Sequence, residues 1–335
     1  TTQATPTDGV VTTFVGSSEG SSDGTGTNAT FRASYGIALD SSGNVYLADY
    51  GNFRVRKITS AGVVTTLAGN SQGSADGTGI NAQFNSPRGI AVDSSGNVYV
   101  GDHNNNRIRK ITPEGVVTTF AGSSQGSTNA TGTNATFNRP IGVAVDSAGN
   151  VYVADSSNHR IRKITSAGVV TTLAGNSLGY VDGTGTNAGF EYPFGIAVDS
   201  SGNVYVAGNN DHRIRKITSA GVVTTLAGSG SSVSLGGNGS FANGTGTNAA
   251  FQNPWGITVD SSGNVYVTDL SNRIRKITSA GVVTTLAGNG SAGSADGTGT
   301  NATFNRPSSC VVNSTGTFLY VGEENNFRVR KIVLP

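Results

Sequence analysis

The chain has 335 residues, of which 49 are glycine and only 13% are charged, and its formal net charge is +2. So small a net charge argues against partners such as a nucleic acid backbone or an anionic membrane surface. No run of residues approaches the ~18 apolar residues of a membrane-spanning helix, which argues against membrane insertion. The single cysteine, Cys310, excludes an internal disulfide.

The start of the chain and its polar composition favour export. The sequence begins TTQATPTDG and contains no methionine, which is typical of a processed mature chain or an excised domain. Few charges, Thr-rich segments and eight Asn-X-Ser/Thr sequons lead us to expect a secreted or extracellular protein. The N-glycosylation sequons begin at Asn28, Asn129, Asn134, Asn238, Asn243, Asn289, Asn301 and Asn313.

Residues 9–16, GVVTTFVG, are the first expected strand, and they match the fourth strand of a unit that recurs along the chain. The most regular marker of this unit is a basic tetrad, whose first arginines stand 53, 53, 53, 60 and 55 residues apart. That period is typical of all-β propeller blades rather than of helical solenoids. The six tetrads are Arg54–Lys57, Arg107–Lys110, Arg160–Lys163, Arg213–Lys216, Arg273–Lys276 and Arg328–Lys331.

Each unit has room for four strands. In the second copy they are expected at 89–93, 97–100, 107–112 and 116–120, where apolar residues alternate with period two and no helical period appears. The recurring turns SSG and SAG end in glycine, which suits a type I turn followed by a left-handed residue. The pattern therefore predicts an all-β chain.

The end of the chain complements its beginning. RVRKIVLP (328–335) is a third strand that lacks a fourth, and residues 9–16 can supply it and so remove an exposed sheet edge. We therefore predict a single domain, 1–335, folded as a six-bladed β-propeller of four-stranded antiparallel blades, the ring being closed by the N-terminal strand completing the last blade. The blades are expected at about 36–69, 89–122, 142–175, 195–228, 256–288, and 309–335 plus 9–16.

The repeated motifs resemble a known family. NHRIRKI (158–164) and the leader GIAVDSSGNVYV (89–100) are similar to the NHL-repeat family of β-propellers, and the resemblance covers essentially the whole chain. It implies the propeller architecture. Family members include RNA-binding domains, receptor ectodomains and an amidating lyase, so the resemblance leaves the function open.

Most charges belong to the repeat itself. Of the 22 Lys and Arg residues, 18 lie in the tetrads. We expect an aspartate at the end of the second strand, such as Asp49, to pair with the first arginine of the third strand, and Asp40 to cap the SSG turn that follows it. Basic residues spread over six symmetric positions do not form a one-sided surface for nucleic acid, so we expect no nucleic acid partner.

Variation between the copies concentrates on one face. The residues just before each first strand should ring the mouth of the central channel, where the aromatics could stack on a sugar or an apolar side chain, or could simply pack together as a plug. Other variable residues fall in the hairpins after the second strands. The mouth residues are Tyr35, Arg88, Ile141, Phe194, Trp255 and Ser308, and the variable hairpins hold Tyr50, His103, His159, His212 and Glu324.

The links between blades carry a DGTG motif. Its oxygen-rich spacing faintly resembles a calcium loop, but it lacks the terminal bidentate acid and has Asn129 or Asn243 in place of aspartate in two copies. We favour a self-capped loop whose NAxF segment buries Phe84 and its equivalents, and expect no cofactor. The fifth link (229–255) is the longest and is a second candidate for partner contact.

No catalytic constellation emerges from the spacing. The three histidines fall in hairpins of adjacent blades, the inner strands bear no acid toward the axis, and Cys310 aligns with core isoleucines. We therefore expect no metal and predict a non-enzymatic extracellular binding or structural module for a protein or glycan partner, either alone or in a homo-oligomer or larger assembly. The alternative is a metal-dependent enzyme of the lyase or lactonase type.

Overall fold

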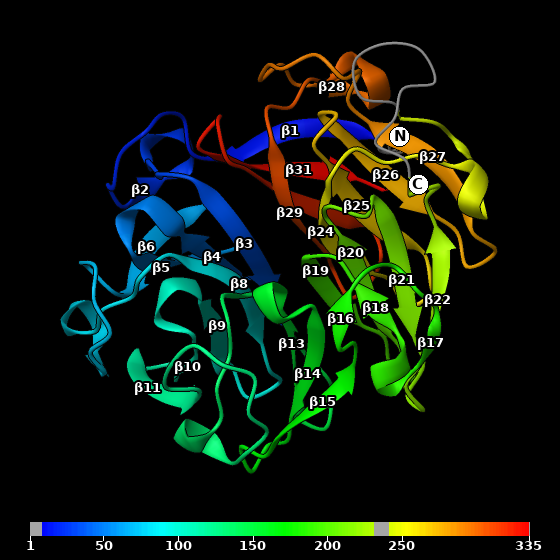
Figure 1. The fold of residues 1–335 in the computed structure, drawn as a ribbon. Helices are drawn as coiled ribbons and strands as arrows, with labels where there is room; N and C mark the ends of the chain where they lie inside the picture. The colour runs from blue at the N-terminus through cyan, green and yellow to red at the C-terminus, as the bar shows by residue number, and fades with distance from the viewer. Residues whose placement is uncertain (1–8, 231–240, 335) are drawn as a thin grey trace.

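The computed structural model describes residues 9–230 and 241–334, which form six antiparallel β-sheets arranged as the blades of a propeller around a central axis (Figure 1). In the first blade, the four long strands run outward from β3, which lies innermost: β3 (Ser34–Leu39), β4 (Val45–Asp49), β5 (Arg54–Ile58), β6 (Val63–Ala68). Blades two and three comprise β8 (Pro87–Val92), β9 (Val98–Asp102), β10 (Arg107–Ile111), β11 (Val116–Ala121), β12 (Pro140–Val145), β13 (Val151–Asp155), β14 (Arg160–Ile164) and β15 (Val170–Ala174).

The remaining blades keep the same order of strands. Blade four comprises β19 (Pro193–Val198), β20 (Val204–Gly208), β21 (Arg213–Ile217) and β22 (Val222–Ala227). Blade five comprises β24 (Pro254–Val259), β25 (Val265–Asp269), β26 (Arg273–Ile277) and β27 (Val282–Ala287). Blade six comprises β29 (Pro307–Val312), β30 (Phe318–Glu323), β31 (Arg328–Val333) and β1 (Val10–Val15).

The links add a short fifth strand that the sequence pattern did not predict. In five blades, two residues of the incoming link pair with the outer strand, and in blade three a single bridge joins Thr131 and Val169. These strands are β2 (Gly24–Thr25), β7 (Gly77–Thr78), β17 (Gly183–Thr184), β23 (Gly244–Thr245) and β28 (Gly297–Thr298); a separate pair, β16 (Ser177–Leu178) and β18 (Gly189–Phe190), lies within one link.

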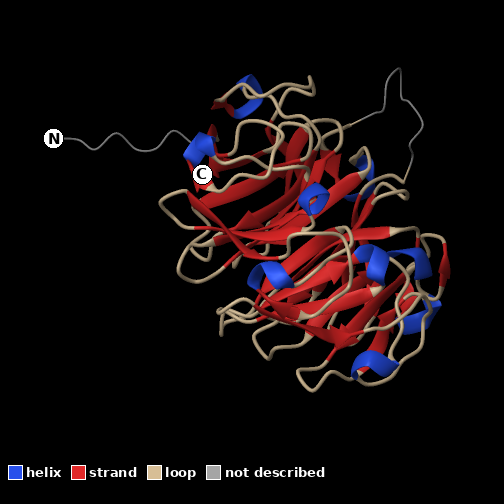
Figure 2. Cartoon of the chain, turned by 90° about the vertical axis from the view of Figure 1, so that its left-hand side faces the viewer, coloured by secondary structure: helices blue, strands red, loops and turns tan. Residues whose placement is uncertain are grey.

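Helical structure in the described residues consists of single 3-10 turns in the links and hairpins, drawn in blue in Figure 2. None of these turns is long or apolar enough to cross a membrane. Those in the links are η1 (Gly26–Asn28), η3 (Gly79–Asn81), η5 (Gly132–Asn134), η7 (Gly185–Asn187), η8 (Gly246–Asn248) and η9 (Gly299–Asn301); those in the hairpins are η2 (Tyr50–Asn52), η4 (His103–Asn105) and η6 (Ser156–Asn158).

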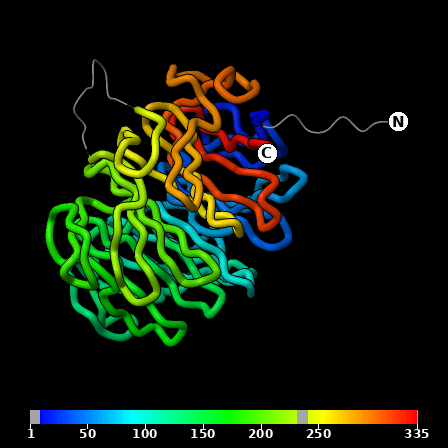
Figure 3. The backbone as a smooth tube through the Cα atoms, turned by 90° about the vertical axis from the view of Figure 1, so that its right-hand side faces the viewer, coloured from blue at the N-terminus to red at the C-terminus, as the bar shows by residue number. Residues whose placement is uncertain are grey.

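The ring closes as predicted. Strand β1 pairs with β31, so that Val11 faces Ile332 and Thr12 faces Lys331, and the Gly9 N–H donates to the Val333 carbonyl at 2.8 Å. The blue and red segments therefore lie side by side in Figures 1 and 3. Val11 and Ile332 are fully buried, so the closure is apolar as well as hydrogen-bonded.

The hairpin turns follow the expected chemistry. Gly43 and Gly62 have φ of +83° and +79°, the left-handed region that glycine adopts without a steric cost. One carboxylate oxygen of Asp40 accepts the backbone N–H groups of Ser42 at 2.9 Å and Asn44 at 2.8 Å. The aspartate therefore caps its own turn, as predicted.

The core consists of six apolar clusters, one at each contact between neighbouring blades. Between blades one and two, for example, Val55 and Tyr46 pack with Val98 and with Phe84 from the link. Phe84 is fully buried, which confirms that the NAxF segment anchors each link. Because each blade buries its faces against its neighbours, stability depends on the complete ring.

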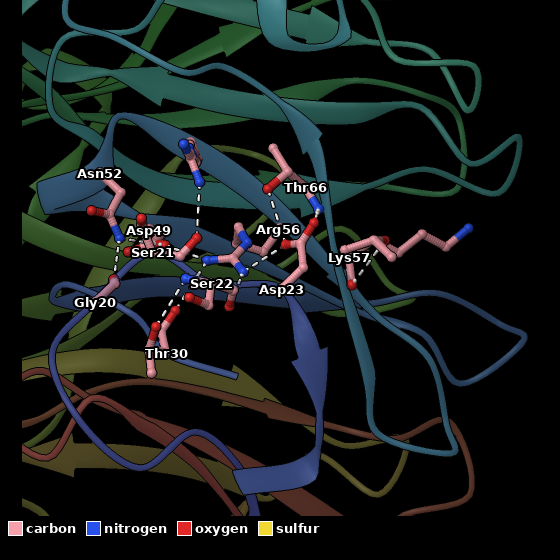
Figure 4. Close-up of polar contacts among 12 residues, drawn as sticks. Gly20, Ser21, Ser22, Asp23, Thr30, Asp49, Asn52, Arg56, Lys57 and Thr66 are labelled. Atoms are coloured by element: carbon pink, nitrogen blue, oxygen red, sulfur yellow. Dashed lines mark hydrogen bonds and ion pairs between the residues drawn. The ribbon is translucent and has the colours of Figure 1, made fainter. Parts of the chain in front are cut away.

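A buried arginine ties each link to its blade, and here the predicted ion pair was assigned to the wrong arginine. Asp49 is the register partner of Arg54, but its carboxylate accepts a bond from the fully buried Arg56 at 2.8 Å. A second Arg56 nitrogen donates to Asp23 of the link at 2.7 Å (Figure 4). The reason is burial: a guanidinium beneath the link needs a counter-ion, whereas Arg54 reaches Ser21 and Asn70 at the surface.

The same arginine recurs in every blade. Each also donates to carbonyl groups of the link and lies about 5 Å above the phenylalanine ring of the NAxF segment, 5.2 Å in the first blade. Where the link has asparagine in place of aspartate, Asn129 and Asn243 still accept an arginine N–H, at 2.7 and 3.1 Å. The equivalents of Arg56 are Arg109, Arg162, Arg215, Arg275 and Arg330, all fully buried.

Candidate functional site

The inner strands approach so closely along the channel that only glycine fits at most of the contact positions. A Cβ at Gly89 would collide with the carbonyl oxygen of Ile141 on the next strand. The neighbouring Ile, Val and Cys side chains then narrow the channel; Cys310 is one of them, only 5% exposed, with its thiol 3.4 Å from the Tyr266 carbonyl. Burial raises the pKa of this thiol, so Cys310 is a core residue, as expected.

Above the narrow section, the structure brings together the residues predicted to ring the mouth. They surround one cavity of about 60 Å³ at the start of the inner strands, while a second cavity of about 180 Å³ opens at the other end of the channel. The residues that line the mouth cavity at the predicted positions are Tyr35, Arg88, Ile141, Phe194, Trp255 and Ser308. Their part in binding remains a prediction.

Aromatic rings fill most of this mouth. The ring centroids of Phe194 and Trp255 are 5.0 Å apart at an interplanar angle of 88°, and those of Tyr35 and Trp255 are 5.5 Å apart. Trp255 is only 9% exposed. Because pockets for small molecules usually measure ~300–1,000 Å³, this space can hold one group of a ligand rather than a whole molecule.

A polar chain crosses the contact between blades six and one. The Tyr35 hydroxyl donates to one carboxylate oxygen of Glu324 at 3.0 Å, and Arg306 donates to the other at 2.9 Å. Burial, and then the charge of Glu324, raise the pKa of Tyr35 well above its usual value. Tyr35 is therefore a neutral hydrogen-bond donor, and the charge of Glu324 is compensated.

Arg88, unlike Arg306, makes no ion pair in the described chain. Its guanidinium lies over the rings of Tyr35 and Tyr50, 5.0 and 5.3 Å from their centroids. Its Nε is buried without a hydrogen-bond partner among residues 9–230 and 241–334. Arg32 and Arg306 at the same rim pair with Glu19 and Glu324, but no such carboxylate reaches Arg88, or Arg139, in the described chain.

The histidines predicted on this face lie in separate environments. His103 is buried, with Nδ1 2.9 Å from Asn104 Oδ1, and burial followed by the charge of Arg88 lowers its pKa to about 4. His159 and His212 occupy left-handed backbone positions, where each Nδ1 accepts a backbone N–H of the following blade, from Tyr192 at 3.3 Å and from Asn253 at 3.0 Å. These two histidines connect blades.

No group of three or more His, Cys, Asp or Glu side chains suited to a metal ion occurs within the described residues. In the DGTG loops, the carboxylate of Asp23 contacts Arg56 and also accepts the Thr66 N–H at 3.1 Å. Calcium at these loops would therefore have to compete with a guanidinium, and the expectation that the loops hold no cofactor remains a prediction.

The sequons differ in their surroundings. Asn28, Asn134 and Asn301 are exposed at equivalent positions, where η1, η5 and η9 end. In the other described sequons, the side-chain oxygens of Asn129, Asn243, Asn289 and Asn313 accept hydrogen bonds from neighbouring groups. Asn238 lies outside the described residues.

Sequence reasoning missed the pairing of Arg306 with Glu324 and the left-handed backbone at the ends of the hairpins and links. A signal for the first existed, because Arg32, Arg88, Arg139 and Arg306 are the cations outside the repeated tetrads. The sequence carries little signal for the left-handed backbone, because the non-glycine residues that adopt it share no chemical type. In the described chain they are Ala33, Phe53, Ser86, Asn106, Arg139, His159, Tyr192, His212, Asn253, Asn272, Arg306 and Phe327.

Comparison with known proteins identifies the repeat. The model of the NHL repeat matches residues 36–58, 84–111, 137–164 and 251–275, and a model described as beta-propeller repeat matches 173–212. The chain is 28% identical over 329 residues to NHL repeat-containing protein 2 from Bos taurus. This match covers 88% of the chain but only 45% of the length of that protein.

Solved structures share the fold. A protein of unknown function from Bacteroides thetaiotaomicron has a TM-score of 0.73 and 25% identity, covering 97% of this chain and 75% of the other. The gluconolactonase XC5397 from Xanthomonas campestris has a TM-score of 0.60 at 14% identity, covering 91% and 88%. At that identity the likeness concerns the fold alone.

Proposed function

Because this chain is a closed six-bladed β-propeller built from NHL repeats, we propose that it is a non-enzymatic extracellular module that binds a protein partner at the mouth of its channel. The observation that carries the proposal is the concentration of unlike residues at this mouth. Six otherwise matching strands present Tyr35, Arg88, Ile141, Phe194, Trp255 and Ser308 there. The turns at the opposite face repeat almost unchanged.

A protein partner suits the mouth better than a glycan. Stacking on a sugar requires an open aromatic face, whereas Trp255 is packed edge-on by Phe194 and Tyr35 and is only 9% exposed. Half-buried rings beside a cation instead match the centre of a protein interface, where aromatic residues and arginine are enriched.

The enzymatic alternative takes second place. A lyase or lactonase of the metal-dependent kind needs several convergent ligands, and the three histidines are held apart in separate contacts. Elemental analysis of the purified chain separates the two functions, since a stoichiometric transition metal would favour the enzyme.

The experiment that tests the binding site compares two positions on one strand. Phe194 lines the mouth and Val198 lines the opposite end of the channel, both on β19. A displayed peptide library is selected on the immobilised chain, and the selected clones are measured against Phe194→Ala and Val198→Ala. We expect at least ~10-fold weaker binding to Phe194→Ala and little change with Val198→Ala. Equal loss with both variants, or ligands found only on a glycan array, contradicts a protein-binding mouth.

The extracellular location has its own support and its own test. Three sequons, at Asn28, Asn134 and Asn301, stand exposed at the edge of the ring, where an attached glycan would meet solvent. An antibody against the chain should detect it in the medium or at the surface of the source cells. Detection in the cell interior alone would contradict this location.

A further inference from the structure

Arg88 is the one cation at a mouth position that is uncharged in the other five copies. Elsewhere in the described chain, buried arginine comes with a carboxylate: Arg56 lies 2.8 Å from Asp49, and Arg330 lies 3.1 Å from Glu323. Arg88 is half-buried with a buried, unpartnered Nε. The Nε atoms of Arg56 and Arg330 are also buried without a partner in the described chain, so Arg88 differs from them in having no carboxylate of these residues within reach of its guanidinium.

The guanidinium is nevertheless held in place. Tyr35 and Tyr50 stack at 4.5 Å between ring centroids, and Arg88 lies over both rings. The hydroxyl of Tyr35 is fixed in turn by Glu324 at 3.0 Å. A cation packed on two rings loses little side-chain freedom when it binds an anion, which favours affinity.

The local charge also favours an anion. Arg139 donates its backbone N–H at 2.9 Å to Asn106, in the same hairpin as His103, and the charges of Arg88 and Arg139 both lower the pKa of His103. Glu324 is the nearest acid to the tyrosines, and Arg306 neutralises it at 2.9 Å. The hairpin of blade two therefore lies near two arginines, whereas the acid on the side of blade three, Glu191, acts on His159.

The size of the cavity narrows the class of ligand. About 60 Å³ accommodates one small group, and a planar guanidinium matches a planar carboxylate through two parallel hydrogen bonds. A protein partner offers that group on aspartate, on glutamate or at its chain end.

We propose that Arg88, seated on Tyr35 and Tyr50, is a carboxylate-binding site at the channel mouth, which recognises an acidic side chain or a terminal carboxylate of the protein partner. This inference rests on the proposed function and names the chemistry of its ligand.

Trp255 is the only tryptophan of the chain and lines the same cavity, so its fluorescence reports on the mouth directly. The intact chain is titrated to ~20 mM with acetyl-Gly-Glu-Gly-amide and with acetyl-Gly-Gln-Gly-amide. A second pair, Gly-Gly-Gly with a free or an amidated terminus, distinguishes the two sources of carboxylate. We expect saturable fluorescence changes with the carboxylate member of at least one pair and not with its neutral match.

The matched variants are Arg88→Gln and Arg139→Gln, which remove the same charge from inside and outside the cavity. We expect Arg88→Gln to weaken binding of the acidic probe at least ~10-fold, because a charge-assisted hydrogen bond is lost. Arg139→Gln, which removes only a nearby charge, should change the affinity for this probe less than about threefold. Equal binding of acidic and neutral probes, no response to any carboxylate, or equal effects of the two variants overturns the carboxylate site.

The two proposals fail separately. If selected peptides bind at Phe194 yet carry no acid and ignore Arg88→Gln, the mouth is a binding site without carboxylate recognition. If binding of the acidic probes depends on Arg88 but binding of no peptide or protein depends on Phe194, the anion site stands and the proposed protein-binding function is wrong.

Discussion

At the scale of single residues, the mouth contains two kinds of side chain that the sequence pattern could not separate. Trp255 is packed between Phe194 and Tyr35, while Arg88 makes no ion pair in the described chain. Position in the repeat showed that these residues share a rim. Whether each one fills space or remains available depends on neighbours from other blades, which only the closed ring brings into contact.

We therefore expect Trp255→Ala and Arg88→Gln to differ in stability. Truncating a packed indole leaves a void and should cost about 3 kcal/mol of unfolding free energy. Arg88→Gln keeps the length of the side chain near the tyrosines and should cost less than about 1 kcal/mol. Urea denaturation measures both, and a tryptophan variant as stable as the parent would mean that Trp255 does not form a plug.

The buried arginine gives a second prediction at this scale. Arg56→Met leaves the fully buried Asp49 without its cation, which should cost about 3–5 kcal/mol. Arg54→Met removes a neighbouring guanidinium that bonds to the surface groups Ser21 and Asn70, and should cost less than about 1 kcal/mol. Thermal unfolding of the pair provides the comparison. Similar losses in the two variants would instead support an ion pair between Asp49 and Arg54, the pairing that the strand register suggests.

At the scale of the blade, blade four places the acid for its buried arginine, Arg215, at a different position from the other blades. It has Gly208 where the other blades have an acid, and Asp211 reaches back from the hairpin toward Arg215. The distance is 3.8 Å, against 2.8 Å for Asp155 and Arg162 in blade three. A Cβ at Gly208 would overlap the Asp211 carboxylate, so the glycine and the displaced aspartate depend on one another.

Exchanging both residues should repair this blade. Gly208→Asp with Asp211→Asn recreates the arrangement of Asp155 and Asn158, in which the amide donates to the carboxylate at 2.8 Å. We expect the double variant to gain about 1–3 kcal/mol, because a buried charge-assisted bond is restored. Gly208→Asp alone should destabilise by a clash, whereas Asp211→Asn alone should cost little, because burial already favours the neutral carboxyl and Asp182 still pairs with Arg215. Additive effects of the two changes in a double-mutant cycle would argue against this coupling.

Asp211 also gives blade four a dependence on pH. Burial raises the pKa of this carboxyl to about 6, so the folded state holds the proton more tightly than the unfolded chain does. The stability that protonation provides is complete below pH ~4 and is lost as the pH rises through ~6, roughly 3 kcal/mol in all. The stability of the parent chain minus that of Asp211→Asn, measured by melting at a series of pH values, should therefore fall between pH ~4 and ~6. A flat difference would contradict the raised pKa.

How far the sequence predicts this structure depends on the range of each interaction. Local patterns sufficed for the strands, the Asp40 turns and the burial of Phe84, because each is decided within a few residues. The pairing of Arg56 with Asp23, the edge strand Gly24–Thr25 and the bond from Tyr35 to Glu324 join segments far apart along the chain. Alternation within one strand carries no information about such contacts.

At the scale of the whole molecule, β1 is the strand that joins the two ends of the chain in one blade. It supplies Val11 and Val15 to two different inter-blade clusters and covers the edge of β31. A chain that begins at Ser17 should therefore lose both apolar anchors and expose a strand edge prone to pairing with other chains. We expect its melting temperature to fall by more than ~10 °C and its tendency to aggregate to rise.

Complementation distinguishes a lost strand from general damage. A synthetic peptide of residues 9–16 offers the same hydrogen bonds and the same two valines, so at excess it should raise the melting temperature of the shortened chain. Binding to the folded state alone stabilises it in proportion to the logarithm of peptide concentration. A peptide with Val11 and Val15 changed to serine is the matched control, because it keeps the backbone but not the apolar contacts. Rescue by both peptides would mean that backbone pairing is enough to close the ring; rescue by the native one alone would assign the closure to the two valines.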